Sequence, residues 1–402
     1  MTEALTPDAL RRDAREWLEA NAPAKGGPDD FSGIHLLGAG SIEEFWEHER
    51  HVYSVVRSWQ RRLVDAGWAG LSWPRVYGGR ELPSWADEVF ADEQSRFGVS
   101  TKALATGLQM VPPAMLRFGT PEQGTRYLPP ALRADEIWCQ LFSEPGAGSD
   151  LTSVNTRAEQ LGNGGWRLNG QKVWTSGAGV SDWGVALTRT ERGTHGREGL
   201  TCFVVNMHDP GVEVRPLREM AGGYHFNEVF LEGVDVERDA MLGDVGGGWP
   251  IARTVLTSER AAIGGGTSGR TAGLLRTTAA SVGNTSDPRV RQAVAAAYIR
   301  ERVLDLHLLR ARSGGSSSSI VKLMYSEHAR LTASDGMAVL GARGMTADGH
   351  ETAATWIDRL LFAPGLRIGG GTDEIQRNAI AERELGLPRE PTPSSSPAGE
   401  GP

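Results

Sequence analysis

The sequence predicts an α+β protein of several domains, because two stretches with helical periodicity flank one stretch of short alternating strands. Helical patterns run through residues 1–138, strand patterns through 139–248, and helical patterns again through 249–388 of the 402-residue chain. A single core stops growing at about 250–300 residues, so the length also favours more than one domain. The helix–sheet–helix order argues against an alternating βαβ sheet.

The first helical stretch is predicted from apolar residues that recur every three or four positions. Leu10, Ala14 and Leu18 share one helical face, and Trp59 and Leu63 share another. Gly- and Pro-rich segments at 21–40 and 72–83 divide the helices. The paired prolines at 112–113 and 129–130 predict further helix boundaries.

The central stretch is predicted to form strands separated by Gly, Asn and Asp-Pro turns. Its alternating runs are TRAEQ, WRLNGQKVWTS, WGVALTRT, LTCFVVNM and EVFLEGVDV. The dipeptide Asn169-Gly170 is typical of hairpin turns, so we expect a turn there, before the strand that ends near Trp174.

The second helical stretch is expected to form a bundle. Helical periodicity covers Val290–Leu309, Ile320–Leu340 and Asp373–Leu385, with loops at 281–288 and 312–318. Residues 389–402, REPTPSSSPAGEGP, have too few apolar groups to offset their ordering entropy, and we expect a disordered tail.

Composition excludes several classes of function. A net charge of −8, with no run of Lys and Arg interleaved with aromatic residues, argues against nucleic-acid binding. Cys139 and Cys202 are isolated in apolar surroundings and are expected in the core, and no metal-ligand spacing is present. Without a signal sequence or an apolar run of 18 residues, we expect no membrane association and a cytoplasmic location.

Three segments have the composition of ligand-binding loops. In Ser143–Asp150 (SEPGAGSD), small residues permit close approach to a ligand and two hydroxyls can donate to it, although a plain turn has the same composition. In Asn169–Gly177 (NGQKVWTSG), an aromatic and two hydroxyls could contact a planar cofactor, or the Trp could belong to the core. In Ile368–Asn378 (IGGGTDEIQRN), a glycine loop enters a helix capped by Thr372 or Asp373, which suits a polar ligand or a plain helix start.

In this order the three segments resemble the acyl-CoA dehydrogenase family, together with FNEVFLEGVDV (226–236), LTSERAAIGG (256–265) and AERELGLPR (381–389). The resemblance covers about residues 5–389. It implies an N-terminal helical domain, a central domain like a β-barrel and a C-terminal four-helix bundle, with FAD between the last two and across a subunit interface. This mode of FAD binding needs no dinucleotide glycine fingerprint, and the sequence has none followed by a βαβ pattern.

The resemblance also assigns site residues. Those that it assigns to FAD are Phe142, Ser143, Trp174, Ser176, Gly371, Thr372 and Glu374, with Trp174 shielding one face of the isoalloxazine ring. Those that it assigns to the acyl-CoA substrate are Ser149, Arg260 and Gly370, whose backbone N–H would donate to the thioester carbonyl.

Desaturation of an acyl thioester requires a base for the α-proton and an acceptor for the β-hydride. One branch of the family carries the base immediately before the Gly-Thr of the third segment, but Gly370 stands there and has no side chain. Another branch carries it in a Glu-Arg pair on a helix, which Glu259 and Arg260 match. Glu259 is therefore the expected base, and the alternative interpretation is half of an exposed ion pair with Arg260.

Two features of the sequence concern the assembly of subunits. The Arg-x-x-Phe-Gly and Gln-x-x-Gly-Gly segments, through which homotetrameric members reach a neighbour's FAD, are not intact. DPRVRQ and SSIVKLMYSEHA resemble bacterial dehydrogenases of steroid side-chain breakdown, some of which pair with a related subunit. The expected partners are an acyl-CoA, an electron-transfer flavoprotein as electron acceptor, and a homotetramer or a heterotetramer.

Three alternatives stay open on the sequence alone: an acyl-CoA oxidase, a dehydrogenase of acyl groups on a carrier protein, and a non-catalytic partner subunit. The acyl group itself is not readable, because pocket depth depends on side-chain positions.

Overall fold

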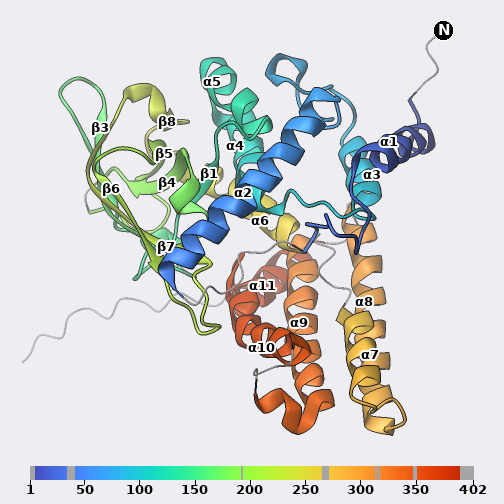
Figure 1. Cartoon of the computed structure of the whole chain (residues 1–402). Coiled ribbons are helices and arrows are strands. Elements are labelled where there is room, and N and C mark those ends of the chain that lie inside the picture. Colours follow the sequence, from blue (N-terminus) through green and yellow to red (C-terminus); the bar gives the residue numbers. More distant parts are fainter. Residues whose placement is uncertain are drawn as a thin grey trace, which may run out of the picture. The chain divides into compact units, whose positions relative to one another are not determined.

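The computed structural model describes residues 5–33, 41–191, 193–264, 271–312, 315, 317–346 and 351–389. They form two compact units, divided between Ala262 and Ile263 (Figure 1). The predicted order of helices, sheet and helices is confirmed. Of the predicted disordered tail, residues 390–402 lie outside the described part of the chain. No helix within these ranges is long and apolar enough to cross a bilayer.

Unit 1 begins with five α-helices and three short turns of helix. The α-helices are α1 (Pro7–Asn21), α2 (Ile42–Asp65), α3 (Trp85–Gln94), α4 (Val111–Phe118) and α5 (Pro121–Leu132). The short turns are the 3-10 helices Arg75–Tyr77 and Lys102–Leu104 and the π-helix Thr106–Met110. The hydroxyls of Thr6, Ser41 and Thr120 accept backbone N–H bonds and cap α1, α2 and α5. The predicted faces of the first two helices meet in one apolar cluster.

The two proline pairs behave differently. The pair 112–113 lies in the first turn of α4, where a missing N–H has no partner to lose, so this predicted boundary is confirmed. The prediction at 129–130 is wrong, because Pro129 and Pro130 lie inside α5. Their carbonyls still accept from Arg133 and Asp135 at 3.2 and 2.9 Å, so the chain keeps its hydrogen bonds past the prolines.

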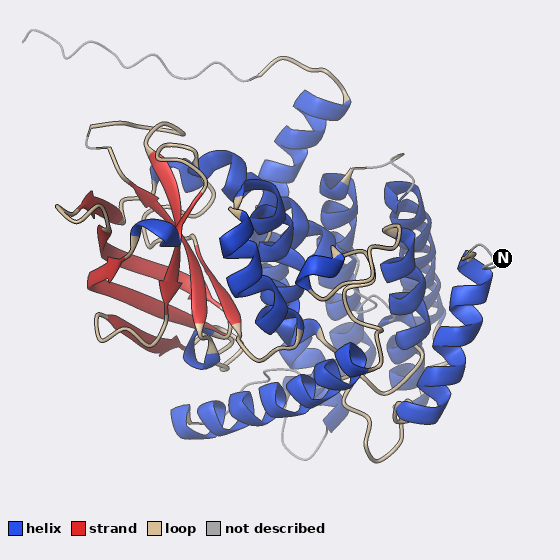
Figure 2. Ribbon diagram, turned by 90° about the horizontal axis from the view of Figure 1, so that it is seen from above, coloured by secondary structure: helices blue, strands red, loops and turns tan. Residues whose placement is uncertain are grey.

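The rest of unit 1 is built on an eight-stranded sheet. Its strands are β1 (Trp138–Leu141), β2 (Arg157–Gln160), β3 (Trp166–Thr175), β4 (Trp183–Arg189), β5 (Leu200–Asn206), β6 (Val212–Leu217), β7 (Phe226–Val236) and β8 (Met241–Leu242). The order is β6-β7-β3-β2-β4-β5-β8, with β1 parallel to β4. Figure 2 shows the strands as one curved layer. Among the described residues the two edge strands, β6 and β8, do not pair with each other, so the sheet is curved like a barrel wall but open.

The expected hairpin at Asn169-Gly170 is not found, because both residues lie within β3, which pairs with β7. The register shifts between Leu168 and Asn169, so the irregularity is a bulge in a continuous strand rather than a turn. A Cβ on Gly170 would lie 2.4 Å from the Thr156 hydroxyl, so the close approach of the loop before β2 requires glycine here.

Strand β1 separates two apolar clusters, because its side chains alternate between the faces of the sheet. Cys139 and Leu141 point into the cluster enclosed by the sheet, whereas Trp138 and Phe142 belong to the cluster formed with the flanking helices. Cys139 and Cys202 are fully buried, as predicted. Burial raises the pKa of each thiol to about 12, so neither is a nucleophile at neutral pH.

The division between the units falls near the end of α6 (Gly248–Gly264), and the rest of unit 2 is helical. Its helices are α7 (Thr271–Ser281), α8 (Pro288–Arg312), α9 (Ser318–Leu340), α10 (Glu351–Ile368) and α11 (Asp373–Ala379), with a 3-10 helix at Gly341–Met345 and a π-helix at Ile380–Glu384. Helix α9 packs against α7, α8 and α10 (Figure 1). Trp356 of α10 is fully buried, and a Cβ on Gly336 of α9 would lie 2.1 Å from its ring. The predicted loop at 281–288 separates α7 from α8, whereas residues 313, 314 and 316 of the predicted loop at 312–318 lie outside the described part of the chain.

We predict that Glu49→Gln stabilises the protein at neutral pH. Glu49 of α2 is fully buried, and neither carboxylate oxygen has a hydrogen-bond partner among the described residues. Burial raises its pKa from 4.5 to about 7. The unfolded chain therefore ionises first, and the fold loses stability as pH rises from about 4.5 through about 7, by about 3 kcal/mol at most.

The measurement is urea denaturation of both proteins between about pH 5 and about pH 8. The advantage of Glu49→Gln should grow across this range, whereas Glu47→Gln at an exposed position of the same helix should show no such trend. A difference in the free energy of unfolding between Glu49→Gln and wild type that does not depend on pH would contradict the prediction.

Candidate active site

Glu259 lies on the buried face of α6. Ile251, Ala252 and Val255 of this helix are fully buried, and Glu259 follows Val255 by one helical turn. Its side chain is partly buried, and the side-chain amide of Gln140 on β1 donates to its Oε2 over 3.2 Å. The carboxylate therefore continues the buried side of α6 and meets β1.

Arg260, the second member of the predicted pair, is also partly buried. Its guanidinium donates to the hydroxyl of Thr257 on the same helix at 3.0 Å. This contact directs the side chain back along α6.

The loop after β1 carries Phe142, Ser143 and Ser149. Phe142 is buried in the cluster beside α6, Ser143 is partly buried and Ser149 is exposed. The loop closes on itself through reciprocal backbone bonds of 3.0 Å between Glu144 and Ala147.

A buried ion pair holds this loop against the sheet. Lys172 of β3 is fully buried, and its ammonium donates to Glu144 Oε1 at 2.8 Å and to the carbonyls of Phe142 and Leu187 at 3.0 and 2.6 Å. Burial disfavours charge on Glu144, but Lys172 and backbone N–H groups outweigh it and hold the Glu144 pKa below its usual range. Burial lowers the pKa of Lys172, against the attraction of Glu144.

The end of β3 places Trp174 and Ser176 beside this loop. The N–H of Val173 donates to the carbonyl of Ser143 at 2.9 Å, so the first two predicted segments are joined. Trp174 has a φ of 63°, a left-handed conformation that is strained for a residue with a large side chain. Its ring is 55% exposed and meets Phe226 edge-on, with 5.7 Å between centroids. The backbone thus presents a large aromatic ring to solvent at the cost of local strain.

The third predicted segment lies in unit 2. Gly370 and Gly371 have φ values of 67° and 89°, which explains why glycine occupies both positions. The Gln376 amide donates to the carbonyls of both, at 2.9 and 3.2 Å. Thr372 caps the short helix α11 by accepting from the N–H of Ile375. Glu374 is exposed and pairs with Arg377.

Asp373 anchors this segment inside unit 2. It is fully buried and accepts from Lys322, Ser326 and Arg367 at 3.1, 2.6 and 2.7 Å. Burial alone would raise its pKa, but these three donors hold it below the usual range. The glycine loop is therefore held rigidly by a charge network.

Sequence reasoning missed the side chains that support these segments. Gln140, Lys172 and Asp373 make the contacts described above, and Asn227 of β7 donates to the carbonyl of Thr175 at 2.9 Å. A signal existed for Gln140, because it is the one polar residue in the otherwise apolar run WCQLF. The described residues contain no group of side chains that could hold a metal ion.

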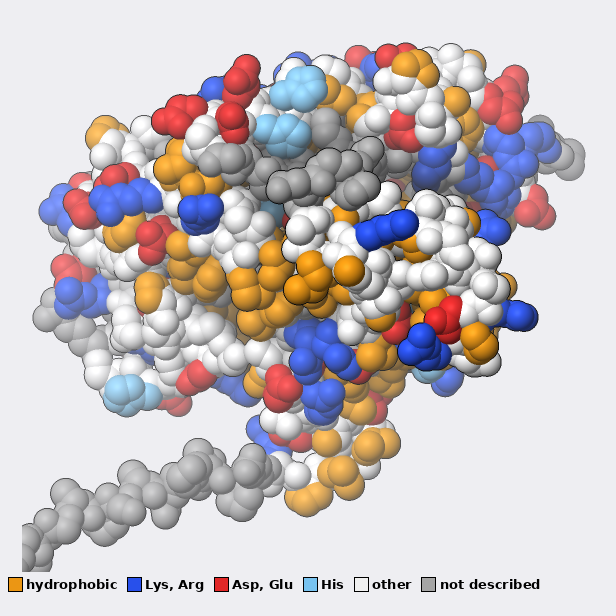
Figure 3. Space-filling model, turned by 60° about the horizontal axis from the view of Figure 1, so that its bottom comes forward, with side chains coloured by type: hydrophobic (Ala, Val, Ile, Leu, Met, Phe, Trp, Pro, Cys, Tyr) orange, Lys and Arg blue, Asp and Glu red, His pale blue; other side chains and the backbone are white. Residues whose placement is uncertain are grey.

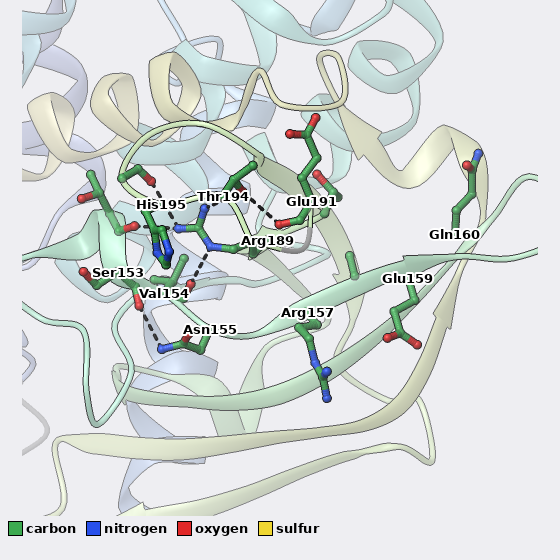
Figure 4. A pocket seen from close by; sticks show the side chains of 15 residues that line it. Ser153, Val154, Asn155, Arg157, Glu159, Gln160, Arg189, Glu191, Thr194 and His195 are labelled. Atoms are coloured by element: carbon green, nitrogen blue, oxygen red, sulfur yellow. Dashed lines mark hydrogen bonds between the residues drawn. The ribbon is translucent and has the colours of Figure 1, made fainter. Parts of the chain in front are cut away.

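A polar pocket of about 810 Å³ also lies in unit 1. It is lined by the loop before β2, by β2 and by the loop after β4 (Figure 4). Arg189 donates to the carbonyls of Thr152, Val154 and Glu198 at 2.7, 3.2 and 2.7 Å, so it ties the two loops together. Figure 4 shows Arg157 directed away from this network.

The sequence matches three domain families along its length. These are the N-terminal domain of acyl-CoA dehydrogenases over residues 40–135, the middle domain over 139–234 and the C-terminal domain over 246–385.

Two relatives are proteins of Mycobacterium tuberculosis strain H37Rv. The acyl-CoA dehydrogenase IpdE1 is 36% identical over 398 residues, which cover 95% of this chain and 98% of that protein. The acyl-CoA dehydrogenase FadE34 is 37% identical over 340 residues, which cover 82% of this chain and 46% of that protein.

Two solved structures have the same fold. The Tcur3481-Tcur3483 steroid ACAD has a TM-score of 0.77 at 25% identity, and the match covers 97% of this chain and 100% of that one. The ChsE4-ChsE5 complex from Mycobacterium tuberculosis has a TM-score of 0.74 at 26% identity, with the same coverage. Because the three domain matches follow one another along the chain and IpdE1 aligns with nearly all of it, this chain belongs to the acyl-CoA dehydrogenase family.

Proposed function

We propose that this protein catalyses α,β-desaturation of an acyl-CoA thioester with Glu259 as the base. FAD-dependent dehydrogenation is the activity of the family. The observation that carries the residue assignment is the position of Glu259 on the buried side of α6, in hydrogen-bond contact with Gln140 of the strand that leads into Phe142 and Ser143. Because Glu259 is present and held by a hydrogen bond, the alternative that this chain is a non-catalytic partner subunit is not favoured.

Family members are flavoproteins, and the residues present fit FAD. In unit 1 the exposed ring of Trp174, held in a strained conformation, and the exposed hydroxyl of Ser176 stand beside Phe142 and Ser143. In unit 2, Gly371, Thr372 and Glu374 at the start of α11 are proposed to contact the rest of the cofactor. When bound, FAD supplies the acceptor for the β-hydride.

The chain's own groups provide the proton chemistry and the orientation of the substrate. Glu259 would remove the α-proton, and the N–H of Gly370 would stabilise the negative charge that develops on the thioester oxygen. Ser149 and Arg260 are proposed to contact the CoA part. The polar pocket tied by Arg189 begins three residues after Ser149, which supports a place for polar substrate groups there.

The acyl group that we favour is derived from a steroid. The support is the steroid ACAD among the solved relatives, whereas straight and branched fatty acyl groups remain the competing substrates of the same chemistry. An electron-transfer flavoprotein is the proposed electron acceptor.

An exposed apolar stripe supports assembly with further subunits. On α8, Ile299, Val303 and Leu306 follow the i, i+4, i+7 spacing of one helical face, with exposed fractions of 59, 39 and 56%. Figure 3 shows one face of the molecule, on which hydrophobic side chains lie among charged ones. Unit 2 therefore has a surface suited to another subunit, either a second copy or a related chain as in the ChsE4-ChsE5 complex.

Glu259→Gln is expected to keep FAD but to slow flavin reduction by acyl-CoA at least about a hundredfold, because the amide cannot take the proton. Anaerobic bleaching of the flavin by straight, branched and steroid acyl-CoAs measures this and identifies the substrate class. Glu228→Gln, at a partly buried glutamate of β7, is the matched control and should reduce normally. Undiminished bleaching of Glu259→Gln would refute the assignment.

Trp174→Asn is expected to lower FAD affinity without lowering the stability of the flavin-free protein. Asn tolerates the left-handed conformation, so relief of strain of about 1 kcal/mol offsets the lost contact with Phe226. Flavin titration measures the FAD affinity, and urea denaturation measures the stability of the flavin-free protein. A large loss of stability with unchanged FAD affinity would show that Trp174 is a packing residue only.

Leu306→Asp is expected to reduce the molecular mass in solution, because a buried unpaired carboxylate disrupts an apolar interface. Light scattering of the purified chain, compared with wild type at the same concentration, measures the mass. A wild-type chain that is monomeric when purified alone, and gains mass only with a related subunit, would select the heteromeric assembly.

A further inference from the structure

We propose that Gln140 is a positioning residue for Glu259, whose side-chain amide fixes the direction of the carboxylate. This inference rests on the proposed function and adds a residue that the sequence motifs do not assign.

The position of Gln140 on β1 is unusual for a polar residue. Side chains alternate along a strand, so Trp138, Gln140 and Phe142 share one face. Trp138 and Phe142 are buried in the cluster that contains Ile251 and Val255 of α6. A polar group among such neighbours costs free energy unless it is hydrogen-bonded, so a Gln here needs a partner.

The partner of Gln140 in the structure is the candidate base. The N–H donates to Glu259 Oε2 at 3.2 Å, and a neutral donor to a carboxylate stabilises its ionised form, which is the form that accepts a proton. The next residue on the helix, Arg260, directs its guanidinium to Thr257. The amide of Gln140 therefore favours one orientation of the carboxylate and its ionised form.

The backbone of Gln140 is itself held firmly. It pairs with Val185 in the parallel ladder of β1 and β4, and its carbonyl accepts from the Thr175 hydroxyl at 3.4 Å. Gln140 thus brings its amide from a rigid strand to a side chain with several rotatable bonds. Such a support limits the conformations of Glu259, which is the requirement for proton abstraction in a fixed geometry.

The amide oxygen of Gln140 can accept a hydrogen bond from Glu259 once that carboxyl is protonated. Gln140 Oε1 is buried and has no hydrogen-bond partner within the described ranges. When Glu259 has taken the α-proton, its carboxyl becomes a donor, and a half-turn of the amide presents Oε1 as acceptor. One side chain can then pair with Glu259 in both protonation states, while the proton stays on Glu259.

The test compares flavin-loaded Gln140→Ala and Gln140→Glu with wild type. The matched control is Gln171→Ala, which removes another Gln-to-Glu hydrogen bond, from Gln171 to Glu228 at 2.9 Å.

Anaerobic flavin reduction by an acyl-CoA that wild type accepts is followed across pH. For Gln140→Ala we expect a maximum rate lower by about tenfold and a half-maximum displaced upward by about one pH unit. For Gln140→Glu we expect a larger upward displacement, because a second carboxylate disfavours ionisation. Gln171→Ala should match wild type.

A second readout does not depend on turnover. Urea denaturation of wild type, Gln140→Ala, Glu259→Gln and the double variant gives the coupling between the two side chains. We expect coupling at high pH, where Glu259 is ionised, and less at low pH.

The outcomes separate this inference from the proposed function. Additive effects on stability, with an unchanged pH profile in an active Gln140→Ala enzyme, would overturn the role of Gln140 and leave Glu259 as the base. Full activity of Glu259→Gln would overturn the proposed function, and with it the positioning role, whatever the coupling.

Discussion

The site in unit 1 depends on one buried ion pair, Lys172 with Glu144. Lys172 joins the strand β3, the loop after β1 and the strand β4 through a single ammonium group. Glu144 in turn accepts from the N–H groups of Asn155 and Thr156, so the same pair fixes both ends of the loop that contains Ser149. Removal of either partner would leave an unpaired buried charge, which typically destabilises a protein by about 3–5 kcal/mol.

Unit 2 uses the same physical solution at its glycine loop. Asp373 is buried among three donors, and the loop that it anchors contains two left-handed glycines. In both units a segment with little apolar surface of its own is held by buried charge. Charge networks of this kind fix geometry more than they add stability, because desolvation offsets much of the attraction.

Much of the fold could be predicted from periodicity, because each helix or strand buries one face of its own sequence. The loop between α7 and α8 and the burial of Cys139 and Cys202 are examples. The turn predicted at Asn169-Gly170 is absent, because its turn propensity is outweighed by the pairing of β3 with β7. The helix boundary predicted at Pro129 is likewise wrong, because α5 continues past this residue and its carbonyl keeps a hydrogen bond.

The candidate site was less accessible to prediction. Glu259 could be named from a local motif, but its contact with Gln140 spans 119 positions and exists only because β1 lies against α6. The left-handed backbone of Trp174 has no local sequence signal, because bulky residues avoid this conformation and tertiary contacts impose it. The assignments of the cofactor and substrate residues remain predictions.

The alternation of β1 between two clusters has an evolutionary consequence. Inserting or deleting one residue between Trp138 and Phe142 would exchange the two faces of the strand, turning Gln140 into the enclosed cluster and Leu141 toward α6. The loop at 145–149 is exposed at most positions and follows the strand directly, so it can change length without this inversion. Homologous sequences that keep a glutamate at the position of Glu259 should therefore vary in length after Glu144 and not before Ser143.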